Sequence, residues 1–288
     1  MWTPQAFGST MLSVPDPPVT LIRPSRRSGI PDFGELWRAR DLALILAWRD
    51  VKVRYKQSLI GIAWAVLQPL LTMVVFTLIF GTFAQLPSQG LDYPVFSMLN
   101  LVPWTFMAAV FTLTANSVLS NRMLVQKVHF PLLILPLACI LVPLVDFVFS
   151  FAVGLGLTAW YGTAIQPTIV LVPLFLLMLG MTAIGLGSFL AVVNVRYRDV
   201  PYAVPFLVQL WLFASGVIYA AAALPERYVE IASLNPAIGA ITGFRWAVAG
   251  TPPPTTSMLV LGVTMTIVFF VGGLVFYRRA ESRFADTL

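Results

Sequence analysis

Long uncharged runs alternate with short polar and charged segments along the chain. Charge clusters, prolines and polar turns separate six apolar runs, at about 60–83, 94–119, 132–160, 167–194, 202–222 and 257–277. Each run is long enough to cross a bilayer as an α-helix, which takes about 20 residues. Apolar and polar residues do not alternate strictly within the runs, so barrel strands are disfavoured. The pattern predicts an all-α polytopic membrane protein with six transmembrane helices.

The composition agrees with a membrane protein, and the distribution of charge indicates how the chain is oriented in the membrane. Hydrophobic residues make up 58% of the 288 residues and charged residues 10%, against roughly 25% charged in a soluble domain. Of the 18 Lys and Arg, nine precede the first run, two lie in each of the loops near 121–131 and 195–201, and three follow the last run. Only Arg227 and Arg245 remain for the opposite side. Because cytoplasmic segments are enriched in Lys and Arg, both termini are expected in the cytoplasm.

The net charge of +6 is therefore a signal of topology, and no nucleic-acid partner is expected. Residues 1–34 are rich in Pro and Ser and are expected to form a disordered cytoplasmic tail, with no evident cleavable signal peptide. Residues 35–288 are expected to form the transmembrane domain. The single cysteine, Cys139, falls within the third run, which leaves no intrachain disulfide.

The densest charge cluster, in "WRDVKVRYKQSLIGIAWAVLQP", directly precedes the first run. Helical spacing places five apolar residues on one seam: Leu44, Trp48, Val51, Tyr55 and Leu59. A basic stripe of Arg49, Lys52 and Lys56 runs beside the seam, and Asp50 is placed to pair with Arg54. The pattern predicts an amphipathic interfacial helix over 36–58.

Two interpretations of this helix remain open. It is either an enlarged positive-inside anchor for the first span or a helix that guards a cytoplasmic entrance for anionic lipid head groups. In the second case the head group would meet Arg49, Lys52, Arg54 and Lys56.

Several motifs occur in series along the chain. They are "RDVKVRYKQSLIGIAWAVLQPLL", "QKVHFPLLILPL", "NVRYRDVPYAVPFLVQLWLFASGVIY", "LPERYVEIASLNP" with "GFRWAVAG", and "FYRRAESRFADTL". Together they resemble the permease subunits of bacterial ABC exporters for surface polysaccharides, of the Wzm and TagG (ABC-2) type, over essentially residues 35–288. The resemblance implies a transport subunit of the bacterial cytoplasmic (inner) membrane that exports a lipid-linked glycan, such as an O-antigen, a capsular polysaccharide or a teichoic acid. It also implies a homodimer of this chain with two copies of an ATPase subunit.

The chain lacks the residues for binding ATP by the usual route. A P-loop needs a Gly-Lys pair followed by Ser or Thr, and none of the three lysines, Lys52, Lys56 and Lys127, follows a glycine. ATP and Mg²⁺ are therefore expected on a separate ATPase chain, and no enzymatic activity or cofactor is expected here. His129 is the only histidine, so no His-based metal site is expected.

The resemblance assigns the two cytoplasmic loops to contacts with the ATPase. In "NRMLVQKVHFP" it makes the segment a coupling helix, with candidate contacts at Arg122, Met123, Leu124, Lys127 and His129. In "NVRYRDVP" the candidates are Arg196, Arg198 and Asp199. An ordinary polar turn and a membrane-edge anchor are the alternatives for the two loops.

On the other side, residues 223–256 are too apolar for a soluble loop and are interrupted by Pro236, Gly239 and Gly243. Two short re-entrant helices fit this pattern. In the resembled family such helices form an external gate, whose candidates are Glu226, Arg227, Glu230, Pro236 and Arg245. A structural cluster of ion pairs is the alternative.

Asp146 is the only acid within a predicted span. It faces either a water-filled path or a neighbouring helix as a hydrogen-bonding partner. Phe106, Phe111 and Phe213 are further candidates for lining a channel.

Two other classes of protein are alternatives. An ion-gradient-driven secondary transporter would need intramembrane ionisable groups and internal repeats, and a polytopic glycosyltransferase would need clustered acids or metal ligands. Asp146 stands alone within the spans, and the external face offers only Asp92, Glu226 and Glu230. The exporter is therefore the favoured class.

Overall fold

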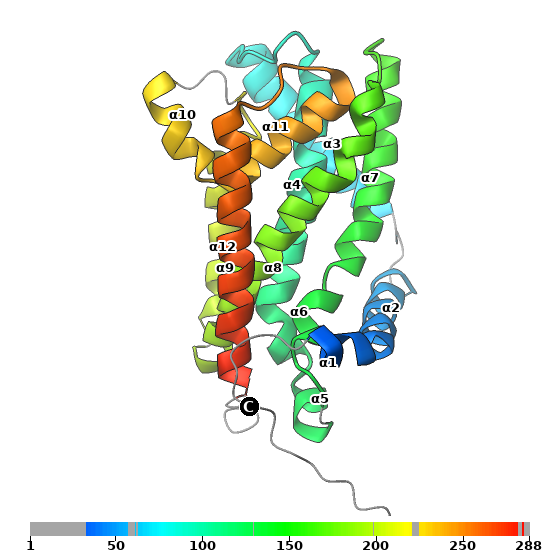
Figure 1. The fold of residues 1–288 in the computed structure, drawn as a ribbon. Helices are drawn as coiled ribbons and strands as arrows, with labels where there is room; N and C mark the ends of the chain where they lie inside the picture. The colour runs from blue at the N-terminus through cyan, green and yellow to red at the C-terminus, as the bar shows by residue number, and fades with distance from the viewer. Residues whose placement is uncertain are drawn as a thin grey trace, which may run out of the picture.

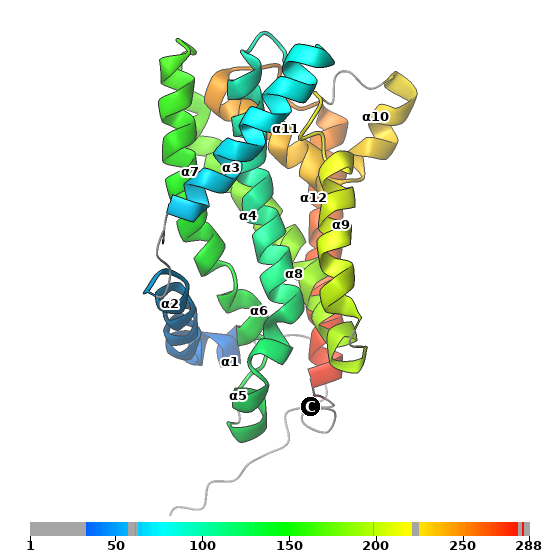
Figure 2. The same ribbon diagram turned by 180° about the vertical axis from the view of Figure 1, so that it is seen from behind.

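The chain folds into a bundle of long helices, seen in Figure 1 and from behind in Figure 2. The computed structural model describes residues 33–56, 61, 63–128, 130–197, 199–220, 225–281 and 284. All regular secondary structure in that part of the chain is helical. This confirms the prediction of an all-α polytopic membrane protein.

The first half of the chain contains the following elements: α1 Phe33–Arg38, α2 Arg40–Lys56, α3 Ala63–Phe76, the π-helix η1 Thr77–Phe83, α4 Tyr93–Ser120, α5 Arg122–Lys127, α6 Ile134–Ala138 and α7 Leu141–Trp160. The second half contains the 3₁₀-helix η2 Pro167–Leu171, α8 Val172–Arg196, α9 Val200–Ala214, α10 Glu226–Ser233, α11 Pro236–Ala249 and α12 Thr256–Ala280. The end of the bundle from which α5 projects is called the α5 end, and the opposite end, which carries α10, is called the α10 end (Figure 1).

Among the described residues, five helical segments are long and apolar enough to cross a membrane. They are Ala63–Phe83, Tyr93–Ser120, Ile134–Trp160, Pro167–Arg196 and Thr256–Ala280. These segments coincide with five of the six predicted spans, and their ends differ from the predicted ones by only a few residues. Uncharged length was therefore a sufficient signal for these helices.

The prediction of one continuous helix over 202–222 is wrong. α9 ends at Ala214 and has 15 residues, which is about 22 Å of helix against a hydrocarbon core of about 30 Å. The Ser215 hydroxyl donates to the Trp211 carbonyl (2.6 Å), and Gly216 adopts φ 67°, which ends the helix. The described chain then continues to residue 220 without regular structure.

The predicted N-terminal interfacial helix is two helices in the structure. α1 begins at Phe33, slightly before the expected start, and a turn at Ala39 separates it from α2. The expected disordered tail lies outside the described residues apart from its last two, which open α1. Residues 57–60, which include Leu59 of the expected apolar seam, also lie outside them.

The third span is interrupted near its start. α6 ends at Ala138 and α7 begins at Leu141. Pro143 has no N–H to donate to the Cys139 carbonyl, so the backbone ladder cannot run unbroken through this region.

α4 lies at the centre of the bundle, packed against α3, α7, α8 and α11, whereas α3 lies at its edge with most of its surface exposed. Aromatic rings join α7 to its neighbours: Phe147 contacts Phe106 of α4 and Phe244 of α11, with ring centroids 5.9 and 6.1 Å apart. Ring contacts of this kind contribute beyond the buried area alone.

α11 is an almost wholly buried helix with well-defined ends. Asn235 caps its N-terminus by accepting from the Ala237 N–H (3.2 Å), and Pro236 occupies the first turn. Gly250 ends it in the left-handed conformation at φ 68° and donates to the Trp246 carbonyl (2.9 Å). The helix packs against α8, α12 and α4 near the α10 end (Figure 1).

α8 and α12 cross with their backbones in contact. A Cβ on Gly185 of α8 would overlap the backbone of Phe269, and one on Gly273 of α12 would overlap the carbonyl of Gly185. Small residues at such a crossing let membrane helices approach closely enough for backbone van der Waals contact.

Substituting Gly273 by alanine is expected to destabilise the chain by about 1–3 kcal/mol, because the two helices must move apart to admit the methyl group. The neighbouring Gly272 has nothing within 4 Å of its Cβ position, which makes Gly272→Ala the matched control. That variant should be neutral or slightly stabilising, since alanine favours helix over glycine by about 1 kcal/mol. Melting temperatures in detergent test the pair, and equal values would contradict the close crossing.

Candidate functional site

Most of the predicted site residues lie at the α5 end. α2 lies on the outside of the bundle near this end, α5 projects beyond it, and the turn between α8 and α9 is at the same end (Figures 1 and 2). The structure thus brings the residues expected to meet lipid head groups to the same end as those expected to contact an ATPase. Two of the latter, His129 and Arg198, lie outside the described residues.

The exposed face of α2 combines basic and apolar side chains. A shallow groove of about 560 Å³ runs along it, lined by Ile45, Trp48, Arg49, Lys52, Val53 and Lys56. The Lys52 ammonium lies 5.9 Å from the centre of the Trp48 ring. This confirms the predicted basic stripe and adds exposed apolar residues on both sides of it. We call this set of residues the α2 groove.

The predicted apolar seam of α2 is wrong in part. Val51 is buried, but Leu44 and Trp48 are exposed, at 61% and 55%. The helix instead packs on α6 and α7 through a face that includes Leu46 and Ala47. Apolar residues occur all round this helix, so spacing alone did not determine which side would face the bundle.

Asp146 of α7 fixes α2 in this orientation. Its Oδ2 atom pairs with Arg54 Nη2 at 2.7 Å, and its Oδ1 atom accepts a hydrogen bond from the Tyr55 hydroxyl. The predicted pairing of Arg54 with Asp50 is therefore wrong, because Asp146 takes Arg54. Of the alternatives left open for Asp146, the hydrogen-bonding contact between helices is the one seen in the structure.

The environment of Tyr55 keeps its hydroxyl protonated. Burial raises the pKa of Tyr55 well above its ordinary value, and the hydrogen bond to Asp146 raises it further. The phenol therefore remains a hydrogen-bond donor at every physiological pH, so titration of Tyr55 does not release this contact.

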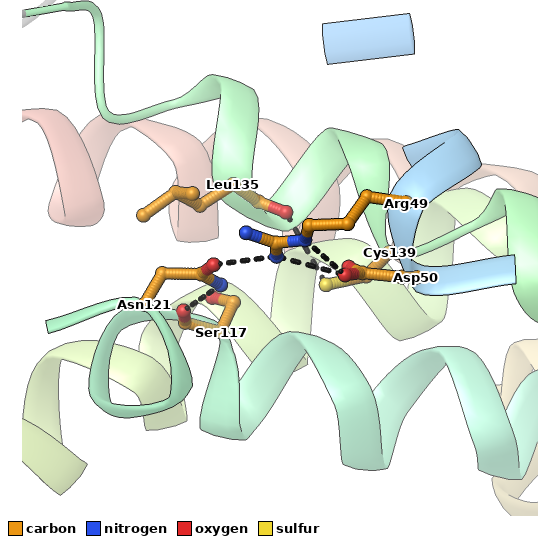
Figure 3. A network of polar contacts seen from close by, with 6 residues as sticks. All are labelled: Arg49, Asp50, Ser117, Asn121, Leu135 and Cys139. Atoms are coloured by element: carbon orange, nitrogen blue, oxygen red, sulfur yellow. Dashed lines mark hydrogen bonds and ion pairs between the residues drawn. The ribbon is translucent and has the colours of Figure 1, made fainter. Parts of the chain in front are cut away.

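Arg49 joins α2 to the junction of α4 and α5, as Figure 3 shows. Its Nη2 atom donates to the Asn121 side-chain oxygen at 2.8 Å, and its Nε atom donates to Asp50 at 2.9 Å. Asn121 in turn donates to the Ser117 carbonyl at 2.9 Å. Sequence reasoning missed Asn121, since nothing in the sequence near residue 121 points to a partner 72 residues away.

α5 presents the predicted coupling residues at its surface. Met123 is 55% exposed, Arg122 and Lys127 are also exposed, and Leu124 is half-buried. Val125 is buried and anchors the helix to the bundle. A second groove of about 350 Å³ is lined by Arg49, Ser120, Asn121, Met123, Leu124, Lys127 and Val128. A short helix that is anchored on one side and exposed on the other is suited to contact with another chain.

The second predicted loop is a tight turn between α8 and α9. Arg196 is exposed and lies over the Tyr197 ring, 5.6 Å from its centre. Asp199, also exposed, accepts backbone hydrogen bonds at the start of α9 through its carbonyl. Both charges are therefore accessible at the surface of this turn.

At the α10 end the structure corrects the expected place of Arg245. This side chain is fully buried instead of lying at a rim. Its two terminal nitrogens donate to Asn100 Oδ1 (2.7 Å) and Gln89 Oε1 (2.8 Å), and its guanidinium carbon lies 4.8 Å from the centre of the Phe96 ring. Burial lowers the pKa of Arg245 to about 10, so it keeps its charge at neutral pH.

The buried arginine secures the α10 end. Asn100 also donates to the Val217 carbonyl at 3.0 Å, and thereby holds the irregular segment that follows α9. The other predicted gate residues do not gather around Arg245: Arg227 and Glu230 are exposed on α10, whereas Pro236 is buried in the first turn of α11. The side chain of Glu226 lies outside the described part of the chain.

The aromatic channel candidates divide into two groups. The prediction that Phe106 and Phe111 line a channel is wrong within this chain, because both side chains are buried in the core, at 3% and 4% exposure. Phe106 packs on Phe147, and Phe111 packs on Trp211. Phe213 on α9 is 53% exposed and stays a candidate.

The fold and these surfaces define a polytopic helical membrane protein with an exposed basic helix and a short projecting helix at one end. A family described as ABC-2 type transporter matches residues 42–249, which include α3 through α11 and most of α2. The chain therefore belongs to the ABC-2 type transporter family. Membership makes it a transport component, and it implies an ATPase partner.

The chain is also similar to individual proteins that are named for export or transport. It is 28% identical to the O-antigen export system permease protein RfbA of Myxococcus xanthus, over 88% of this chain and 98% of that protein. It is 26% identical to the protein of the same name from Klebsiella pneumoniae, over 86% of this chain and 95% of that protein. It is 21% identical to the polysialic acid transport protein KpsM of Escherichia coli, over 81% and 91%.

Proposed function

We propose that this chain is the membrane subunit of an ATP-driven exporter that moves a lipid-linked polysaccharide across the cytoplasmic membrane. The observation that carries the proposal is the family match, which covers most of the chain. Relatives that align over nearly their whole length are named for the export of O-antigen or polysialic acid. The chain is proposed to work as a homodimer with two copies of a separate ATPase subunit.

In the proposed topology the α5 end faces the cytoplasm and both termini lie there. The enrichment of Lys and Arg in the segments at this end supports the orientation. α9, together with the irregular segment after it, forms the sixth crossing. α10 and α11 form the external re-entrant pair, and the burial of nearly all of α11 supports this, since irregular or short helical segments at membrane depth need protein around them.

The ATPase is proposed to dock on α5 and on the turn between α8 and α9. Exposed apolar and basic residues occur together on α5, as interfaces with soluble subunits require. The turn adds the exposed charges of Arg196 and Asp199 at the same end of the bundle. Closure of two ATPase subunits around ATP would then push on both elements.

The head group of the lipid-linked glycan is proposed to meet the α2 groove. Its lysines, Lys52 and Lys56, offer ammonium groups to a pyrophosphate, while Trp48 and Val53 offer apolar surface to the lipid. Arg54 is held by Asp146 and Arg49 by Asn121. Of the four basic residues predicted to meet the head group, the two lysines are therefore proposed to carry this contact.

The proposed function is tested by ATP hydrolysis of the chain co-purified with its candidate ATPase in lipid, with and without the host's lipid-linked glycan. A stable complex whose hydrolysis rises with glycan supports the exporter. A complex that forms but ignores the glycan contradicts the proposed substrate, and failure to form a complex contradicts the docking surface.

Reversing the charges of Lys52 and Lys56 to glutamate is expected to raise the half-saturating glycan concentration at least about tenfold. Each lost contact to an ionised group costs about 1.5–3 kcal/mol, and 1.4 kcal/mol is a factor of ten. The double arginine variant keeps the charge and should respond like the wild type. Arg40→Glu, an exposed position near the start of α2, controls for net charge. An unchanged glycan response in the double glutamate variant would exclude the α2 groove.

A further inference from the structure

We infer that Arg49 is a positioning residue that ties the start of α5 to α2, so that a displacement of α5 is transmitted to the helix that receives the substrate. The inference rests on the proposed function, because it needs an ATPase that moves α5. It goes beyond that proposal by naming the physical link between the two surfaces. It also gives Arg49 a role other than binding a head group.

The geometry of Arg49 carries the inference. Its Nη2 atom lies within hydrogen-bonding distance of two oxygens, one on Asp50 (2.8 Å) and one on Asn121 (2.8 Å). Asp50, the next residue in the same helix, also accepts from Nε and fixes the plane of the guanidinium. Arg49 therefore extends from α2 in one orientation, with the Asn121 side chain as its acceptor on the other element (Figure 3).

Asn121 is the residue at which α4 ends and α5 begins. Its own carbonyl accepts from the N–H groups of Leu124 and Val125, which are the first backbone hydrogen bonds of α5. Its side chain donates to the Ser117 carbonyl in the last turn of α4. A pull or push on α5 thus reaches the Asn121 side chain through the backbone, and Arg49 passes it to α2.

The two grooves at this end support the same interpretation. Arg49 lines the α2 groove and also lines the groove along α5, and it is the residue that the two sets of lining residues share. A side chain that lines both grooves can be displaced by a ligand in the α2 groove or by a partner chain bound along α5. In the described part of the chain, no other residue of α2 has a hydrogen bond to the junction of α4 and α5.

Spin labels on the two helices test the link directly. With Cys139→Ser as background, labels are introduced at exposed positions of α2 and α5, by Leu44→Cys and Gln126→Cys. In the complex with ATPase, the distance between the labels is expected to stay narrow and unchanged between the nucleotide-free and ATP-trapped states, because the helices move together. In Arg49→Met the distance should change on trapping, since α5 moves without α2.

Substitutions at the partner residue distinguish a tie from a head-group ligand. Asn121→Leu removes the acceptor and should change the distance between the labels as Arg49→Met does. The double variant should change this distance no further, because both substitutions remove the same hydrogen bond. Asn121→Asp keeps an acceptor for Arg49 but loses the donation to the Ser117 carbonyl, so it should lie between the wild type and Asn121→Leu. Arg40→Met, another arginine of α2, is the matched control, since its contacts are with Trp37 and Asp41.

The functional readout is glycan moved per ATP hydrolysed. We expect this ratio to fall several-fold, and to the same extent, in Arg49→Met and in Asn121→Leu, because each substitution removes the same hydrogen bond. If Arg49→Met raises the half-saturating glycan concentration while Asn121→Leu has no effect, Arg49 is a head-group ligand and the inference is overturned. An unaltered distance between the labels in Arg49→Met overturns it as well.

Failure of the proposed function gives a different result. If the candidate ATPase does not act on α5, a second label pair, between α5 and α12, shows no response to ATP in the wild type. If the ATPase moves α5 but Arg49 does not link it to α2, the distance between α5 and α12 changes with ATP. In that case the distance between α2 and α5 is the same in the wild type and in Arg49→Met.

Discussion

Replacing Arg245 with methionine is expected to destabilise the folded chain by about 3 kcal/mol. The change leaves the buried Asn100 Oδ1 and the partly buried Gln89 Oε1 without their donors, and an unsatisfied buried oxygen costs about 1–3 kcal/mol. Part of this cost is offset, because a buried guanidinium is itself poorly solvated and its Nε atom has no partner among the described residues. Unfolding in mixed micelles, followed by helical circular dichroism, measures the difference.

Two further variants sharpen the test. Arg245→Lys keeps the charge, but one ammonium group cannot replace a fork that reaches two acceptors, so an intermediate loss is expected. Arg227→Met changes an exposed arginine on α10 and should alter stability by less than about 0.5 kcal/mol. Wild-type stability of Arg245→Met would mean that the buried hydrogen bonds of Arg245 contribute nothing to the α10 end.

Replacing Asp146 with alanine is expected to release α2 from α7. The change removes the acceptor of the Tyr55 hydroxyl and the ion pair with Arg54. A hydrogen bond to a charged acceptor contributes about 1.5–3 kcal/mol, and a half-exposed ion pair contributes up to about 1 kcal/mol. Their sum is about 3 kcal/mol, which corresponds to about a hundredfold shift toward the undocked helix.

Hydrogen exchange of the α2 amides in lipid measures this release, because exchange rates follow the population of the open form. Asp146→Asn keeps an oxygen acceptor for Tyr55 and should show a smaller rise in exchange. Asp41→Asn, an exposed acid in the first turn of α2, is the control and should leave exchange unchanged. Protection of α2 that persists in Asp146→Ala would show that its apolar face is sufficient to hold it.

The spans could be predicted because they depend on a local property, the length of sequence without charge. The exception is the fifth span, where the uncharged run continues beyond the helix. The hydrogen bond of Ser215 and the positive φ of Gly216 end α9 inside an apolar run. Apolar composition determines which residues avoid water, but it does not determine where a helix stops.

The contacts within the candidate site were harder to predict, because they join residues that are distant in sequence. Asp50 at i, i+4 was the expected partner of Arg54, yet Asp146 from another helix takes that place. The oxygen of Tyr55 and its acceptor are 91 residues apart. The local rule of helical pairing is worth only a few tenths of a kcal/mol, so a better-buried tertiary partner overrides it.

Arg245 illustrates the same limit at the other end of the molecule. In sequence it is one of two basic residues on the external side, and exposure was the simple expectation. The structure instead supplies Asn100 and Gln89 as neutral acceptors, and no carboxylate is required to hold the charge. Neutral polar residues are scattered through every span, so sequence alone did not single out these two.

The contact between the backbones of α8 and α12 has a mechanical consequence. Helices that meet through long side chains can slide past each other when the side chains change rotamer. Helices whose backbones touch cannot slide in this way. Each of these helices has 25 residues, or about 37 Å, and α11 rests against both near the α10 end. We therefore expect α8 and α12 to move together as one rigid unit, so that a displacement of the turn between α8 and α9 would be passed on to α11.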